Sequence, residues 1–142
     1  MKRIVIDASV VLKWYLDDED NCRPALSLLE RYVSQELDII APSLLGYEVI
    51  NGLAIAKKRG RIRADKLQMA VQGFMDLEIS QKHISSFYPK VIHFYNIYNL
   101  SAYDASYLAL ADEESIPLIT ADERLYNTVK KDLHWIKRLS NL

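Results

Sequence analysis

The sequence predicts an α/β fold: a parallel β-sheet with helices on both of its faces. Short, mainly apolar segments recur along the chain, and longer stretches with apolar residues at helical spacing separate them. Continuous apolar runs are typical of strands that are buried on both faces, as parallel strands are. The alternation of such strands with helices therefore predicts a parallel sheet built from βαβ units.

The composition sets bounds on the function. With 142 residues, of which 50% are hydrophobic and 26% charged, the chain is typical of one globular domain spanning residues 1–142. A formal net charge of −1 gives no extended cationic surface, so nucleic-acid contact needs a local basic patch. The single cysteine, Cys22, excludes an internal disulfide and fits a reducing compartment. We expect a cytoplasmic protein, because no signal-peptide pattern and no apolar run of membrane-spanning length is present.

The first predicted strand, residues 4–6, is an unbroken run of β-branched side chains that ends at Asp7. We expect Ser9 to cap the helix that follows, in which Val10 and Trp14 recur at helical spacing. An Asp at the carboxyl end of a central strand lies where open α/β sheets bind ligands. The alternative is that Asp7 only caps the helix or begins a turn.

The next stretch predicts a loop, a helix and a strand. Residues 17–20 are all acidic, which is typical of a solvated turn, and Asn21 with Pro24 opens a helix. Residues 37–41 form a short apolar segment that stops at Pro42 and predicts the second strand. The apolar positions of the intervening helix are Leu26, Leu29 and Val33.

Two antiparallel helices and a short strand follow. We expect Ser43 to cap the third helix, which ends near Gly60, and residues 63–75 to form the fourth helix. Residues 77–80 predict the third strand. An apolar and aromatic stripe between residues 87 and 98 marks a fifth helix, and this stripe is expected to face the core.

The last third of the chain predicts two more helices and two more strands. Ser101 begins a sixth helix that runs through Glu114, and residues 117–121 predict the fourth strand. Asp122 then precedes a short helix, and residues 134–136 predict the last strand.

Two acidic residues fall on helical faces that are otherwise apolar. Glu48 lies on the apolar stripe of the third helix, and Asp104 heads the apolar stripe of the sixth. An ionised carboxylate without a partner is too costly to bury, so such groups are paired, neutralised or bound to metal. Each acid also has a simpler explanation. Ser101-x-x-Asp104 has the spacing of a capping box, so Asp104 would only cap its helix. Glu48 lies near the N-terminus of its helix, where the positive end of the helix dipole stabilises a negative charge.

The topology of the predicted fold brings these acids together. In parallel βαβ units, each helix after a strand begins at the carboxyl edge of the sheet. The third helix carries Glu48 within its first two turns, at a rise of about 8 Å from that edge, and the sixth helix begins there with Asp104. Asp7 and Asp122 follow the first and fourth strands. These four residues, which we call the acidic quartet, are therefore expected to converge on one edge.

Four carboxylates on one edge repel one another, raise one another's pKa values and require a cation. Because all the donors are oxygens, the quartet favours Mg²⁺ or Mn²⁺ over zinc, and the 3 histidines are scattered among different elements. We assign Asp7 and Asp104 as direct metal ligands, and Glu48 and Asp122 as ligands or water-mediated supports. Such an ion activates a water molecule, neutralises a phosphodiester and steadies the leaving oxygen.

The ordered set of motifs around these acids resembles the PIN-domain ribonucleases, and most closely the VapC-type toxins of toxin–antitoxin pairs. The resemblance covers nearly the whole chain, and the order and spacing of the quartet agree with the family's own four acids. The motifs that carry it are Ile4-Val5-Ile6-Asp7-Ala8-Ser9, residues 44–51 with Glu48, Ser101-Ala102-Tyr103-Asp104-Ala105 and Leu118-Ile119-Thr120-Ala121-Asp122.

The resemblance implies a PIN-like three-layer sandwich whose parallel strands are ordered 3-2-1-4-5, so that the first and fourth strands are neighbours. It implies a Mg²⁺- or Mn²⁺-dependent endoribonuclease. A cognate antitoxin and a homodimer are implied as well.

Further side chains are candidates for supporting the quartet. Ser9 and Thr120 are expected to hydrogen-bond to its carboxylates without contacting the metal themselves. Asn51, one turn beyond the quartet glutamate, orients that carboxylate, contacts substrate or is an ordinary helix-face residue. Lys13 and Arg124, each close in sequence to a quartet acid, are placed to contact the scissile phosphate.

One dense basic run, residues 57–63, surrounds the turn between the third and fourth helices. Lys57, Lys58 and Arg59 are candidates for gripping RNA phosphates, which adds salt-dependent affinity without sequence specificity. A solvated hairpin tip and a docking site for an acidic protein partner are the alternatives.

Other protein classes compete with the nuclease interpretation. A response-regulator receiver domain is also doubly wound, but it needs paired acids after the first strand, where this chain has Ala8 and Ser9. A non-catalytic RNA- or protein-binding module is the alternative from a different class, although it has no use for an intact quartet. A metal-dependent phosphatase of small substrates stays open, as do transfer, ribosomal and messenger RNA as substrates and one or two metal ions.

Overall fold

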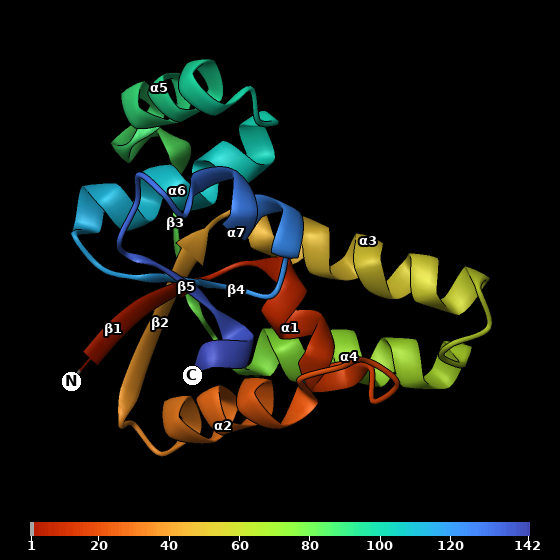
Figure 1. Cartoon of the computed structure of the whole chain (residues 1–142). Helices are drawn as coiled ribbons and strands as arrows, with labels where there is room; N and C mark the ends of the chain where they lie inside the picture. The colour runs from red at the N-terminus through yellow and green to blue at the C-terminus, as the bar shows by residue number, and fades with distance from the viewer. Residues whose placement is uncertain (1) are drawn as a thin grey trace.

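The computed structural model describes residues 2–142 and contains a five-stranded, fully parallel sheet (Figure 1). The strand order is β3-β2-β1-β4-β5, which confirms the predicted α/β class and the order 3-2-1-4-5. The strand bounds are β1 Lys2–Ile6, β2 Leu37–Pro42, β3 Ser80–Lys82, β4 Leu118–Thr120 and β5 Ile136–Arg138.

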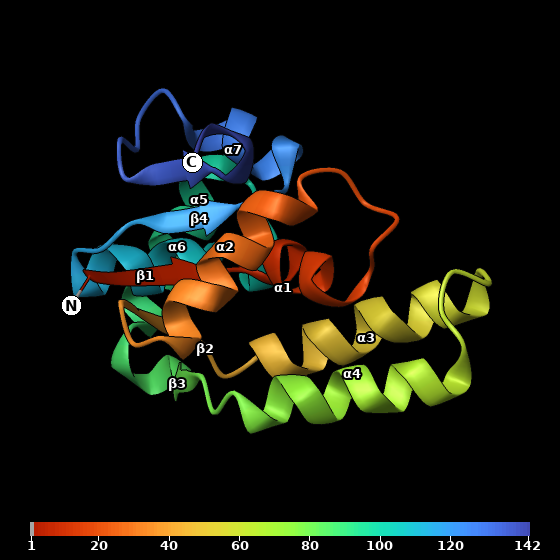
Figure 2. The same ribbon diagram turned by 90° about the horizontal axis from the view of Figure 1, so that it is seen from below.

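Helices cover both faces of this sheet and make it the middle of three layers (Figure 1). On one face α6 packs against β1, β2 and β4, and α5 packs on the outside of α6. On the other face α2 packs against β2 and α1, and in Figure 2 the α3–α4 pair runs out beyond the sheet. The helix bounds are α1 Ala8–Tyr15, α2 Cys22–Val33, α3 Leu45–Lys58, α4 Ala64–Asp76, α5 Tyr88–Tyr98, α6 Ala102–Glu114 and α7 Glu123–Val129, with short 3₁₀ turns η1 Ile84–Ser86 and η2 Leu139–Asn141.

The burial of β1 and α6 in the core matches the apolar patterns of their sequences. Ile4, Val5 and Ile6 are buried on both sides of the sheet, as their continuous β-branched run predicts. Helix α6 is buried from Ala105 to Ala111 without interruption, because the sheet covers one side of it and α5 covers the other. Its first turn stays at the surface, at the carboxyl edge of the sheet.

Three predicted features in the first half of the chain are wrong. Asp7, not Ser9, caps α1, and the N-cap position of α3 is Leu44, not Ser43. On α2 the buried residues are Ala25 and Leu28; of the predicted stripe, Leu29 packs partly buried against the core, whereas Leu26 and Val33 are exposed. The phase of α2 is set by its packing against α1 and β2, which the apolar spacing of a short helix does not specify.

The acidic loop is not a simple solvated turn. Asp18 and Glu19 both accept hydrogen bonds from the Arg61 guanidinium, at 2.8 Å and 2.9 Å, and Glu19 pairs with Lys13 at 3.3 Å. The loop therefore ties the start of α2 to the turn between α3 and α4.

Both edge strands begin later than predicted. Glu78 adopts a left-handed conformation (φ 51°) after α4, so β3 starts at Ser80 rather than at residue 77. A turn from Leu133 to Ile136 delays β5, which then extends to Arg138. Each of these strands is only 3 residues long, and its bounds depend on the neighbouring strand that it pairs with. None of the helices in residues 2–142 combines the length and the hydropathy that a transmembrane span requires.

Candidate active site

Asp7 lies at the carboxyl end of β1, and its carboxylate is held on both oxygens. The Ser9 amide donates to Oδ1 at 3.1 Å, the Ser9 hydroxyl donates to the same oxygen, and the Thr120 hydroxyl donates to Oδ2 at 2.5 Å. The Ala121 amide in turn donates to the Ser9 hydroxyl at 2.9 Å. These contacts join the ends of β1 and β4, so Ser9 and Thr120 contact the quartet as predicted.

Burial dominates the electrostatics of Asp7, a residue that is only 6% exposed. The pKa of Asp7 is raised to about 6: loss of solvation is the main cause and the neighbouring Asp122 charge adds to it, while the hydrogen bonds from Ser9 and Thr120 oppose the shift. The structure thus holds a carboxylate where water does not solvate it, which is an environment that favours binding of a cation.

Asp122 lies next to Asp7 because both are tied to Thr120. The Asp122 amide donates to the Thr120 hydroxyl at 3.0 Å, and the Asp122 carboxylate caps α7 by accepting from the Leu125 amide at 3.2 Å. The cap uses Oδ1, so the second oxygen of Asp122 faces other partners.

Glu48 points from the first part of α3 toward α6, where its Oε1 accepts a 2.6 Å hydrogen bond from the Tyr107 hydroxyl. Partial burial raises the pKa of Glu48, the Tyr107 hydrogen bond lowers it and the nearby Asp104 charge raises it. Helical spacing places Tyr107 in the apolar stripe of its helix and does not reveal this contact. A buried tyrosine needs a partner for its hydroxyl, which is the signal that could have found it.

Tyr107 also shows how closely the acids are grouped. Its pKa is raised mainly by burial and by the hydrogen bond to Glu48, and the charges of Glu48, Asp7 and Asp104 each add to the shift. One hydroxyl therefore lies within electrostatic range of three quartet members.

Asp104 occupies the first turn of α6, where its amide donates to the Ser101 hydroxyl at 3.1 Å. Of the two hydrogen bonds of a capping box, this is the one from the backbone amide to the N-cap side chain. The Asp104 carboxylate instead accepts from the Arg124 guanidinium at 3.1 Å, and the same Arg124 nitrogen lies 3.9 Å from Asp122. Capping therefore accounts for the backbone of this turn and not for its carboxylate.

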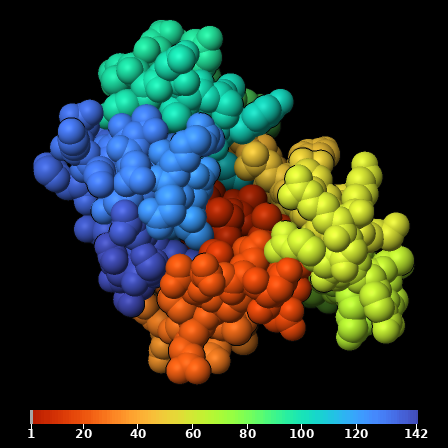
Figure 3. All heavy atoms as spheres, turned by 45° about the vertical axis from the view of Figure 1, so that its right-hand side comes forward, coloured from red at the N-terminus to blue at the C-terminus, as the bar shows by residue number. Residues whose placement is uncertain are grey.

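The four acids lie after β1 and β4 and in the first turns of α3 and α6, at the carboxyl edge of the sheet. In Figure 3 the dark red N-terminal segment lies recessed between the blue C-terminal part of the chain and the gold start of α3. Within residues 2–142, no three acidic, histidine or cysteine side chains lie close enough to enclose an ion as they stand. The donor chemistry nevertheless fits a hard divalent cation, because the quartet offers only carboxylate oxygens and its members repel one another.

Asn51 lies beside this site and takes no part in the hydrogen bonds described above. It lines a cavity of about 460 Å³ together with Glu48, Leu44, Tyr47 and Tyr103. The side chain of Asn51 is exposed, so a substrate in this cavity can reach it.

The predicted phosphate-binding residues fall into two groups. Arg124 contacts the quartet directly, whereas Lys13 is paired with Glu19 and lines a different cavity with Gly60 and Arg61. Lys57, Lys58 and Arg59 are exposed at the far end of α3, well beyond the turn that carries Glu48.

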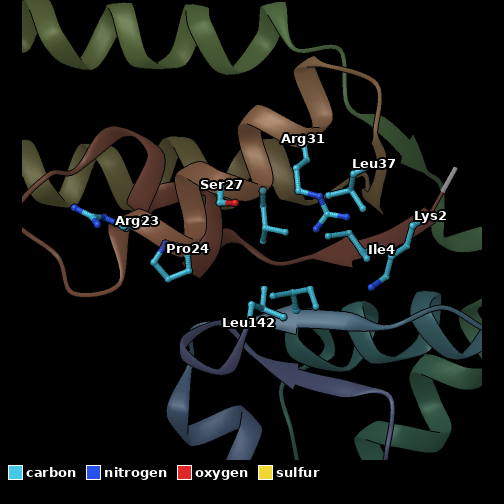
Figure 4. A pocket seen from close by; sticks show the side chains of 10 residues that line it. Lys2, Ile4, Arg23, Pro24, Ser27, Arg31, Leu37 and Leu142 are labelled. Atoms are coloured by element: carbon cyan, nitrogen blue, oxygen red, sulfur yellow. The ribbon is translucent and has the colours of Figure 1, made fainter.

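A cavity of about 420 Å³ opens at the opposite, amino edge of the sheet (Figure 4). There Lys2 and Arg31 extend beside the apolar side chains of Ile4, Leu37 and Leu142. Because this cavity contains no member of the quartet and lies at the starts of β1 and β2, it is separate from the site described above.

Comparisons with known proteins agree with this architecture. The chain matches the PIN domain family over residues 4–131. It is 35% identical over 129 residues to the VapC ribonuclease Mb0985 of Mycobacterium bovis, covering 88% of this chain and 90% of the relative. It is 27% identical over 126 residues to ribonuclease VapC3 of Pyrobaculum aerophilum, covering 87% of this chain and 92% of the relative.

Among solved structures, the crystal structure of PAE2754 from Pyrobaculum aerophilum matches with a TM-score of 0.68 at 18% identity, over 99% of this chain and 92% of that one. At 18% identity the structural match establishes only the fold, whereas the family match and the sequence relatives establish the family. Taken with the quartet at the carboxyl edge of a 3-2-1-4-5 sheet, they show that this chain belongs to the PIN-domain family, among the VapC proteins.

Proposed function

We propose that this chain is an endoribonuclease that cleaves RNA phosphodiester bonds with the help of Mg²⁺ or Mn²⁺, and that it is the toxin of a VapBC-type toxin–antitoxin system. The observation that carries the proposal is the arrangement of Asp7, Glu48, Asp104 and Asp122 at one edge, with Asp7 buried and held by Ser9 and Thr120. Ribonuclease activity is the function named for the VapC relatives.

Asp7 and Asp104 would hold the ion directly, and Glu48 and Asp122 would hold it directly or through water. When bound, the ion would supply a lowered pKa for an attacking water and positive charge for the phosphodiester and the leaving oxygen. Oxygen-only ligation favours Mg²⁺ or Mn²⁺.

The chain's own residues set the geometry of this chemistry. Ser9 and Thr120 fix both oxygens of Asp7, so that its carboxylate cannot turn away from the edge. The Tyr107 hydroxyl orients Glu48 from inside the fold. Arg124 reaches the same edge from solvent and is the best-placed cation for the scissile phosphate.

RNA outside the site would be held by the exposed Lys57, Lys58 and Arg59. Asn51, in the cavity beside Glu48, would contact the nucleotide next to the cleaved bond or orient Glu48. Lys13 would act only if its pair with Glu19 opened.

The proposed partners follow from the family. A cognate antitoxin is expected for a VapC-type toxin, and we infer a homodimer that works in the cytoplasm, with residues 1–142 forming one domain in each copy. Sedimentation of the purified chain, alone and with its antitoxin, measures both assemblies.

RNA cleavage is the direct test of the proposed function. Wild-type protein should cut single-stranded RNA internally in Mn²⁺ or Mg²⁺, and EDTA should abolish the products seen on a denaturing gel. Asp104→Asn should lower the rate by at least about a hundredfold, because metal assistance of this kind is worth several kcal/mol of barrier.

A matched control is Asp65→Asn, which removes the same charge from an exposed pair with Arg63 and should cleave at the wild-type rate. If Asp104→Asn also cleaves at the wild-type rate, Asp104 only supports its helix and the assigned site is wrong. Hydrolysis of a small phosphomonoester without RNA cleavage would favour the phosphatase, and inactivity on both with retained RNA binding would favour a non-catalytic module.

A further inference from the structure

Arg124 takes a position that the quartet chemistry alone does not explain. One of its guanidinium nitrogens, Nη2, lies 3.1 Å from Asp104 Oδ2 and 3.9 Å from Asp122 Oδ2. The Arg124 side chain is 72% exposed, so it crosses the site from the solvent side. A single cationic group therefore bridges two quartet acids that come from different elements.

The oxygens that Arg124 contacts are those that the backbone leaves available. Asp122 uses its other oxygen, Oδ1, to cap α7 through the Leu125 amide. Asp104 is anchored through its amide, which donates to Ser101, and its carboxylate is left for Arg124. A divalent cation shared by the two acids would use the same two carboxylates, and its charge would repel the guanidinium that bridges them.

The strengths of the two interactions decide which cation prevails. An exposed arginine–carboxylate pair is weak, because water screens it and ordering the side chain costs entropy. A divalent ion carries twice the charge on a compact centre and is held by several carboxylates at once. Metal binding should therefore expel the guanidinium, and the Arg124 contacts slightly oppose metal binding.

We propose that Arg124 has two successive partners: Asp104 and Asp122 as long as no divalent ion is bound to them, and the RNA phosphate once such an ion takes their carboxylates. Arg124 is the second residue of α7, directly after Glu123 and close to the capping Asp122, so the released side chain stays tethered at the same edge. The inference rests on the proposed function and adds a competition between Arg124 and the metal.

The test separates metal binding from catalysis. Binding of Mn²⁺ alone, without RNA, is measured by titration calorimetry or by the electron paramagnetic resonance signal of free Mn²⁺. Arg124→Gln should bind Mn²⁺ up to about fivefold more tightly than wild type, the equivalent of about 1 kcal/mol for an exposed ion pair. The KM for RNA at saturating Mn²⁺ should rise for the same variant, because glutamine carries no charge to bind the phosphate.

The matched control is Arg3→Gln. Arg3 pairs with Asp38 at 3.9 Å and with Glu114 at 3.8 Å near the start of β1, so this variant removes the same charge from a surface pair at the opposite edge of the sheet. It should change neither the Mn²⁺ affinity nor the KM. Arg124→Lys, which keeps the charge without the planar fork, should lie between wild type and Arg124→Gln in both measurements.

The outcomes distinguish the two levels of the proposal. If wild type binds Mn²⁺ and Arg124→Gln binds it equally or more weakly, Arg124 does not compete with metal, and the inference is overturned while the nuclease proposal stands. An unchanged KM for Arg124→Gln would overturn the claim that the released Arg124 side chain binds the RNA phosphate. A wild-type protein that fails to bind Mn²⁺ would overturn both.

Discussion

The structural role of the Asp7 carboxylate conflicts with the role as a metal ligand that we propose for it. As the cap of α1 and the acceptor for Ser9 and Thr120, it joins β1 to β4. As a buried anion near Asp122, it has a pKa of about 6, well above the ordinary value of 3.8. In the absence of a cation, its charge at neutral pH therefore costs stability.

The sign of this cost predicts a pH dependence. A folded pKa raised above the unfolded one means that the folded state binds the proton more tightly, so stability falls as pH rises from about 4 through 6. The loss at pH 7 is on the order of 3 kcal/mol for Asp7 alone. Asp7→Asn removes this effect at nearly constant volume, so in EDTA its melting temperature relative to wild type should increase from pH 4 to pH 7.

Thermal unfolding by circular dichroism measures this difference, and millimolar Mn²⁺ at pH 7 should stabilise wild type more than the variant. The control is Asp65→Asn, since Arg63 lowers the pKa of the exposed Asp65 and the trend should have the opposite, weaker sign. An Asp7→Asn curve that runs parallel to wild type across this range, with equal response to Mn²⁺, would leave Asp7 with a structural role only.

At the scale of elements, the approach of α1 to α3 sets how near Asp7 and Glu48 lie. Gly52 of α3 faces Leu12 of α1 so closely that a methyl group at position 52 would come within 2.7 Å and 2.9 Å of the two Leu12 methyl carbons. No side chain larger than hydrogen fits there unless Leu12 moves. The packing of α1 against α3 thus limits how far apart Asp7 and Glu48 lie.

This close approach predicts different effects for two glycine substitutions. Gly73→Ala in α4, where the nearest atoms belong to Tyr15 at 3.7 Å, should stabilise the fold by up to about 1 kcal/mol through helix propensity. Gly52→Ala should gain less or destabilise the protein, because overpacking costs about 1–3 kcal/mol. Urea unfolding compares the two variants.

The double variant Leu12→Ala/Gly52→Ala supplies the control, because removing the Leu12 side chain opens the space that the new methyl group needs. The two substitutions should therefore be coupled favourably in a double-mutant cycle. Additive effects, with Gly52→Ala as stabilising as Gly73→Ala, would contradict tight packing of α1 on α3.

At the scale of the whole molecule, opposite charges are separated along α3. Glu48 and the rest of the quartet lie near its first turn, whereas Lys57, Lys58 and Arg59 lie at its far end, where the α3–α4 pair projects beyond the sheet (Figure 2). The net charge of −1 conceals this separation. This separation suits the proposed function, in which the tip holds a polyanion while one of its phosphates reaches the quartet.

Neutralising the tip predicts a change in salt dependence. Replacing Lys57, Lys58 and Arg59 by Ser should weaken RNA binding and lower the slope of log affinity against log salt by about one for each phosphate that the tip no longer neutralises. Fluorescence anisotropy at several salt concentrations measures the slope.

A control with equal charge change replaces Lys130, Lys131 and Lys137, which lie elsewhere on the surface. This variant should keep the wild-type slope. If the tip variant also keeps the wild-type slope but binds the antitoxin more weakly, the tip belongs to the protein partner.

The sequence was most informative where structure is local. The alternation of apolar runs and helical stripes predicted the parallel sheet, because both patterns arise from neighbours along the chain. The bounds of β3 and β5 were wrong because a 3-residue edge strand exists only through its pairing with another strand. The phase of α2 was wrong for a related reason, since α1 and β2 select which of its sides is buried.

The candidate site divides in the same way. That Asp7, Glu48, Asp104 and Asp122 meet at one edge followed from the sequence alone, because in a parallel sheet the position of a residue relative to a strand end fixes its edge. The tertiary structure decided which side chains these acids contact: Tyr107 contacts Glu48, and Arg124 contacts Asp104 and Asp122. It likewise decided that Lys13 pairs with Glu19. A hydrogen bond or ion pair depends on atoms a few ångströms apart in space, and sequence spacing does not contain that distance.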